Sequence, residues 1–90
     1  MKKHEAQVST SDTGMEAKIE CEAKGIDVVV KLEDGFKAMT ISAPITFSCG
    51  TAQGHLDAGK HEINGFGTTA NAISAIENAI GGQKFFVFTK

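Results

Sequence analysis

The chain has no arginine, no tryptophan and no tyrosine, and its nine basic residues are all lysines. Arginine supplies the planar fork that reads guanine edges and phosphates, and aromatic platforms hold unstacked bases. The net charge of −2 is also the wrong sign for attracting a phosphate backbone. We therefore expect no nucleic-acid partner.

Long apolar runs and numerous cysteines are also absent. The apolar runs are far shorter than the roughly 20 residues that span a bilayer, and the opening MKKHEAQ lacks the apolar core of a signal peptide. We expect a cytoplasmic protein with no membrane partner. Cys21 and Cys49 are too few for a disulfide framework and are expected to be free thiols, with a Cys21–Cys49 pair as the alternative.

What is present is typical of a globular protein. The chain has 90 residues, of which 41% are hydrophobic and 22% are charged. Two cores would leave each half below the size that usually folds without a disulfide or metal. Residues 1–90 are therefore predicted to form a single small domain with one core.

Alternation of apolar and polar residues predicts strands in the first half of the chain. Residues 15–23 alternate strictly, and residues 26–32 follow after a turn at Lys24 and Gly25, which predicts a hairpin. Asp34-Gly35 is a strong tight-turn pair, and it leads into a third strand over residues 36–42.

Three further segments complete the predicted sheet. Pro44 leaves residues 45–49 as either a bent continuation or a separate short strand. Residues 5–11 are a weak candidate for a first strand, and residues 60–66 for a late one.

The pattern changes near the C-terminus. Ile73, Ile76 and Ile80 recur at helical spacing, which predicts one amphipathic helix that packs on the sheet through these isoleucines. The following KFFVFTK does not alternate, as is typical of a strand covered on both faces. The predicted fold is α+β: one mostly antiparallel sheet of about four to six strands, a single helix in the C-terminal half packed on one face, and a final buried strand.

The stretch SCGTAQGHLDAGKHE, residues 48–62, contains the candidate metal ligands Cys49, His55 and His61. Structural zinc sites usually contain a local pair of ligands two to four residues apart, and this spacing has none. We interpret the stretch as a glycine-rich surface loop without a cofactor. A small-ligand or metal-binding domain that uses this loop is the alternative function.

No convincing catalytic set is found, so we expect no enzyme. Cys49 with a histidine would need a pocket and a positive setting for its thiolate. The glycines of GFGTT, residues 65–69, lack the lysine of a phosphate loop, and the paired acids Glu20 and Glu22 are expected on a solvated strand face. The leading hypothesis is a non-catalytic protein-binding module, a small inhibitor or regulator of the kind that phages and mobile elements carry for counter-defence.

The predicted contact surface is an exposed face of the sheet. Glu16, Glu20 and Glu22 alternate with apolar residues, so they form an acidic stripe that suits a partner protein with a basic surface. The second apolar face of the strand that contains Phe85 and Val87 is the other candidate surface. A homodimer through an exposed edge strand is an additional possibility.

Overall fold

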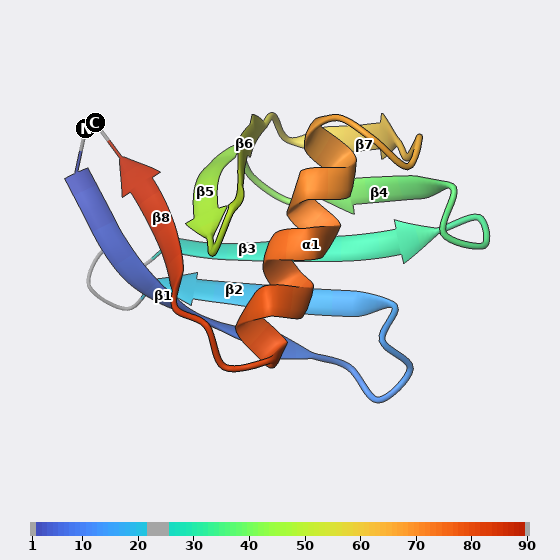
Figure 1. Ribbon diagram of the computed structural model, residues 1–90. Coiled ribbons are helices and arrows are strands. Elements are labelled where there is room, and N and C mark those ends of the chain that lie inside the picture. Colours follow the sequence, from blue (N-terminus) through green and yellow to red (C-terminus); the bar gives the residue numbers. More distant parts are fainter. Residues whose placement is uncertain (1, 22–25, 90) are drawn as a thin grey trace.

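The computed structural model describes residues 2–21 and 26–89, and within them it has eight strands and one helix (Figure 1). The elements are β1 (Lys2–Thr10), β2 (Glu16–Cys21), β3 (Ile26–Glu33), β4 (Ala38–Ile41), β5 (Ile45–Cys49), β6 (Ala52–Leu56), β7 (Gly59–Glu62), α1 (Thr68–Ile80) and β8 (Phe85–Thr89). The strand order is β6-β5-β8-β1-β2-β3-β4-β7, and every neighbouring pair is antiparallel. The α+β class and the single helix in the C-terminal half are confirmed, but the sheet has eight strands and not the four to six that we predicted.

The strand β1 connects the two halves of the sheet. Its first residues, Lys2 to Ala6, pair with β8, whereas Gln7 to Thr10 pair with β2. Figure 1 shows this strand curving from one half of the sheet to the other, with the start of β1 beside the end of β8. A weak strand candidate in the sequence therefore has a central place in the sheet.

The sheet is strongly curved. The evidence is that its two outermost strands are neighbours in the sequence. Only Asp57 and Ala58 separate the end of β6 from the start of β7, although these strands stand at opposite ends of the strand order. The helix α1 crosses the sheet and packs mainly on β5 and β6 (Figure 1). One continuous core contains residues from the strands and from α1.

One unpredicted strand, β6, lies wholly in the segment that we interpreted as a loop, whereas β7 overlaps the late strand candidate at residues 60–66. Residues 48–62 contain the end of β5, all of β6 and all of β7. Gly54 lies within β6, and a Cβ atom there would come within 2.9 Å of the Thr68 methyl carbon and 3.3 Å of the Phe47 ring. The glycine therefore provides space for the start of α1 against the sheet rather than a turn.

The buried face of α1 differs from the predicted one. Thr69, Ala72 and Ala75 are buried, whereas Ile73 and Ile76 are half-buried and Ile80 is 54% exposed. Small side chains let a helix approach a sheet closely, so they, rather than the isoleucines, form the tightest contact. In the part of the chain that the structure describes, no helix combines the length and apolar character needed to cross a bilayer.

Candidate functional site

The three candidate metal ligands do not converge. Cys49 is completely buried, and burial raises the pKa of its thiol above the ordinary value of 9.0. His55 is exposed, and it lies opposite Thr46 in the β5–β6 pairing. Side chains alternate between the two faces of a strand, so Thr46 and Cys49 face opposite sides of β5.

Both histidines are engaged by Asp57. His55 Nε2–H donates to Asp57 Oδ1 at 3.0 Å, which leaves His55 Nδ1 to accept from the Thr46 hydroxyl at 2.7 Å. His61 Nε2–H donates to the Asp57 carbonyl oxygen at 2.7 Å. Among residues 2–21 and 26–89, no group of three or more potential metal-ligating side chains is gathered. These histidines hold the short connection between β6 and β7.

The predicted acidic stripe lies on the outer face of the sheet, together with lysines. Glu20 and Lys18 are exposed and Glu16 is half-buried, and all three project to the same side of β2. Lys31 is the cross-strand neighbour of Glu16. Glu22 and the predicted turn at Lys24 and Gly25 lie outside the described residues. The described part of this face is therefore mixed in charge rather than uniformly acidic.

The other predicted contact residues lie in the core. Phe85 and Val87 are 2% and 3% exposed, and the Phe85 ring stacks on Phe47 with 6.2 Å between the ring centroids. The outward side of β8 carries Phe86 and Phe88, which are half-buried, and the Lys3 ammonium lies 4.1 Å from the centre of the Phe86 ring. Phe85 and Val87 therefore stabilise the fold and leave no surface for a partner to contact.

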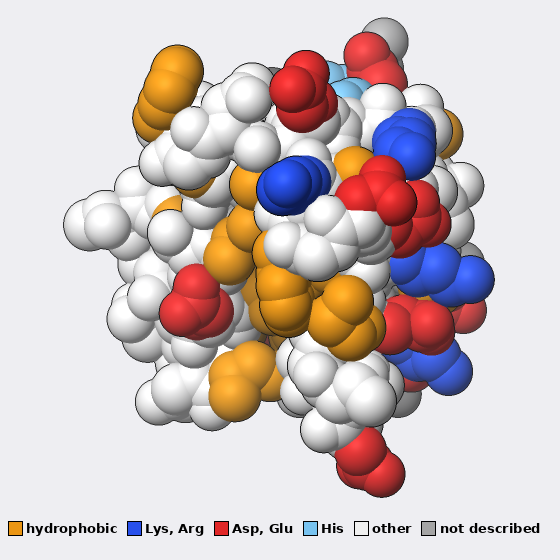
Figure 2. All heavy atoms as spheres, turned by 90° about the vertical axis from the view of Figure 1, so that its right-hand side faces the viewer, with side chains coloured by type: hydrophobic (Ala, Val, Ile, Leu, Met, Phe, Trp, Pro, Cys, Tyr) orange, Lys and Arg blue, Asp and Glu red, His pale blue; other side chains and the backbone are white. Residues whose placement is uncertain are grey.

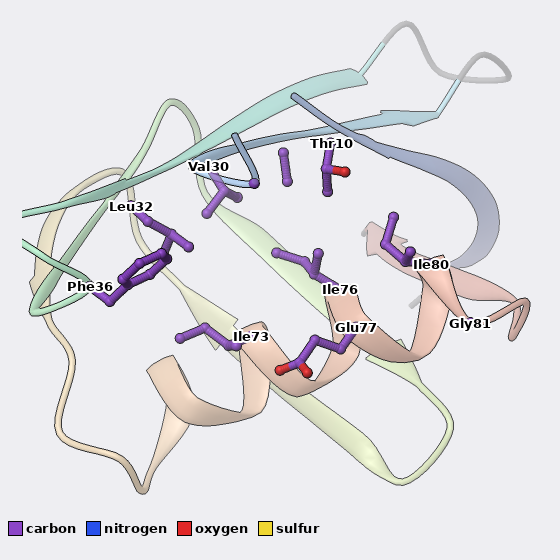
Figure 3. A pocket seen from close by; sticks show the side chains of 11 residues that line it. Thr10, Val30, Leu32, Phe36, Ile73, Ile76, Glu77, Ile80 and Gly81 are labelled. Carbon is purple, nitrogen blue, oxygen red and sulfur yellow. The ribbon is translucent and has the colours of Figure 1, made fainter. Parts of the chain in front are cut away.

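A groove of about 590 Å³ opens between α1 and the inner face of β2 and β3. The strands contribute Ala17, Val30 and Leu32 to it. Figure 3 shows Ile73 and Ile76 of α1 facing this wall, with Ile80 at the far end. In Figure 2, hydrophobic side chains gather in a band through the middle of the face that was at the right of Figure 1. We call the groove between α1 and the inner face of β2 and β3 the helix groove.

Phe36 lies at one end of the helix groove in an unusual backbone conformation. Asp34 and Gly35 have positive φ values of 53° and 67°, as expected for the predicted Asp-Gly turn, and Phe36 follows with φ of 69°. A left-handed conformation at a bulky residue costs roughly 1–2 kcal/mol. The Lys37 N–H donates to the Glu33 carbonyl oxygen at 3.1 Å, and Lys60 Nζ lies 3.2 Å from Asp34 Oδ2. The closed turn thereby keeps the Phe36 ring beside the groove while it remains 54% exposed.

Glu77 is the one charged residue among the described residues that line the helix groove. It belongs to α1, between Ile73 and Ile80, and it is exposed. Within the part of the chain that the structure describes, its carboxylate forms no salt bridge. The groove is thus an apolar surface with one unpaired negative charge at its edge.

Comparison of the chain with protein-family models, with curated protein sequences and with solved structures gave no match.

The sequence contained a signal for the helix groove that our predictions missed. The helical spacing of Ile73, Ile76 and Ile80 predicts that the helix packs on the sheet through these three residues. Alanine and isoleucine share this helix as two adjacent stripes. The alanine stripe marked the close contact, and the isoleucine stripe was therefore free to line a groove.

Proposed function

We propose that this chain is a non-catalytic protein-binding module, an inhibitor or regulator, that binds a partner protein through the helix groove. The observation that carries the proposal is the open apolar groove itself. Phe36 and Ile80 are each 54% exposed beside it, although burying large apolar side chains away from water lowers the free energy. The inner face of the sheet forms one wall, so a partner would contact the sheet and the helix together.

The chemistry of the lining favours binding over catalysis. The walls are apolar, and Glu77 is the single charged group that the described lining residues bring to the groove. Active sites generally bring several polar groups together at a reacting atom. An apolar groove beside a helix is instead a common receptor for the anchor side chains of a protein segment.

The test uses a displayed library of random short peptides selected on the immobilised protein. We expect enriched peptides with two apolar anchors, whose affinity falls about tenfold or more when Ile80→Gln replaces one apolar side chain of the groove wall. Glutamine is a good helix former, so the fold is expected to remain intact, as a thermal melt would verify. The matched control is Ser74→Gln, at an exposed position of the same helix, which should leave affinity unchanged.

Three results would contradict the proposal. The first is a library that yields no peptide sensitive to Ile80→Gln. The second is binding of an apolar dye in the groove without any such peptide, which would indicate a small-molecule site. The third is concentration-dependent self-association that Ile80→Gln abolishes, because a second copy of the chain would then occupy the groove.

A further inference from the structure

We infer that the partner segment is cationic, with a lysine or arginine placed beside two apolar anchors, and that Glu77 selects it. The inference rests on the proposed function, because it names the chemistry of the segment that enters the helix groove. It is carried by the position of Glu77 on the groove wall and by charge complementarity.

The dimensions of the groove limit the segment to a short one. Ile73 and Ile80 mark the helix wall, and seven residues of α-helix rise roughly 10 Å. Two anchors are roughly 6–7 Å apart whether they are four residues apart on a helix or two residues apart on an extended strand. The groove therefore accommodates two apolar side chains in either backbone conformation.

The charge at the groove edge determines what flanks those anchors. Glu77 lies between Ile73 and Ile80 along the helix, so its carboxylate is beside any side chains that fill the groove. Lysine and histidine are absent from the described lining residues, so the carboxylate has no partner within the groove. An apolar segment that covered this edge with an acidic residue would place like charges together, whereas a cation would complete an ion pair.

The outer face of the sheet provides a strict control for this inference. Glu20 is exposed on the outer side of β2, whereas Ala17 of the same strand lines the groove from the inner side. Glu20→Lys and Glu77→Lys change the net charge of the chain equally. Any difference between the two variants therefore reports where the partner binds, and not the overall charge.

The experiment measures the affinity of the library-selected peptides for four proteins: the parent, Glu77→Gln, Glu77→Lys and Glu20→Lys. We expect the selected peptides to carry a lysine or arginine next to the anchors. Affinity should fall about two- to fivefold with Glu77→Gln and about tenfold or more with Glu77→Lys. It should stay within about twofold of the parent with Glu20→Lys, and Glu77→Gln should also reduce the salt dependence of binding.

The two proposals fail in different ways. If peptide binding depends on Ile80 but is equal for the parent, Glu77→Gln and Glu77→Lys, the groove binds a partner and the inference about its charge is wrong. Selection of peptides without basic residues would overturn the inference in the same way. A loss with Glu20→Lys as large as with Glu77→Lys would also overturn it, because the outer acidic face would then be the contact.

Discussion

The two sides of α1 meet the sheet in opposite ways. Toward β5 and β6, Ala72 lies with Phe47 and Leu56 around a gap of only about 10 Å³, which is also lined by core residues of β2, β3, β4 and β8. On the side of β2 and β3, the helix groove has about 590 Å³ of open space. Both sides are apolar, so hydrophobicity alone does not separate them. The size of the helix side chains does, since alanine permits close approach and isoleucine holds the helix away from the sheet.

The close packing around Ala72, the closed side, stabilises the fold, whereas the helix groove, the open side, is the surface that we propose for binding. Removing part of a side chain from a close-packed contact lowers the free energy of unfolding, because the cavity left behind does not refill. A residue beside an open groove already contacts water, so its removal changes the folded and unfolded states more nearly equally. Substitutions on both sides and a thiol-modification experiment test this division, from the largest expected effect to the smallest.

The largest effect is expected on the closed side. Phe47→Ala removes the ring that stacks on Phe85, and it should lower the free energy of unfolding by about 3–5 kcal/mol. The matched change on the open side, Ile80→Ala, should alter it by about 0.5 kcal/mol or less. Urea denaturation followed by circular dichroism measures both. Similar losses from the two variants would show that the closed and open sides contribute alike to stability.

An intermediate effect is expected at the boundary. Ile76 is half-buried and lines both the small gap and the helix groove, so Ile76→Ala should cost about 2 kcal/mol, at the low end for such a truncation. Ser74→Ala, on the exposed side of the helix, should change stability by less than about 0.5 kcal/mol. The same denaturation measurement applies. Equal small effects from Ile76→Ala and Ser74→Ala would place Ile76 wholly on the open side.

The smallest effect concerns the Cys49 thiol on the closed side. Burial raises its pKa in the folded protein, so the folded state holds the proton more tightly than the unfolded state. The stability from the neutral thiol is fully present below the ordinary thiol pKa and is lost as the pH rises through the raised folded value. We expect Cys49→Ala to flatten this alkaline decline in a pH series of thermal melts. An unchanged decline would mean that Cys49 does not titrate in the way that its burial implies.

Thiol reactivity provides the direct check on the same residue. A thiol reagent at mildly alkaline pH should modify Cys49 only after denaturant is added, because the thiolate is the reactive form and burial suppresses it. Rapid modification in the native protein would show that the closed side opens readily.

The segments with strict patterns were predictable from sequence, and the irregular ones were not. The alternation in residues 15–23 predicted the strand β2, and the isoleucine spacing predicted α1, because each pattern follows the geometry of one element. By contrast, β6 was hidden by Gly54, whose role depends on how closely Thr68 and Phe47 approach it. No local pattern reports such a contact between distant parts of a chain.

For the candidate site, too, the local pattern was predictable from the sequence and the long-range contacts were not. The sequence predicted that the isoleucine stripe of α1 packs on the sheet. Ile73 and Ile76 do pack against the core, but Ile80 is 54% exposed. The sequence also placed Phe85 and Val87 on a contact surface, whereas the position of β8 between β5 and β1 buries them. A run of apolar residues contains no information about which strands flank it, so the face that a partner could reach was not deducible.

By itself, the sequence determined the α+β class, the hairpin turn at Asp34-Gly35 and the presence of one helix, because these depend on local backbone preferences and on the periods of strands and helices. Only the tertiary structure decided the number of strands, the curvature that brings the ends of β6 and β7 together and the opening of the helix groove. These features depend on contacts between segments far apart in the chain, where the volumes of facing side chains set how closely a helix and a sheet can pack.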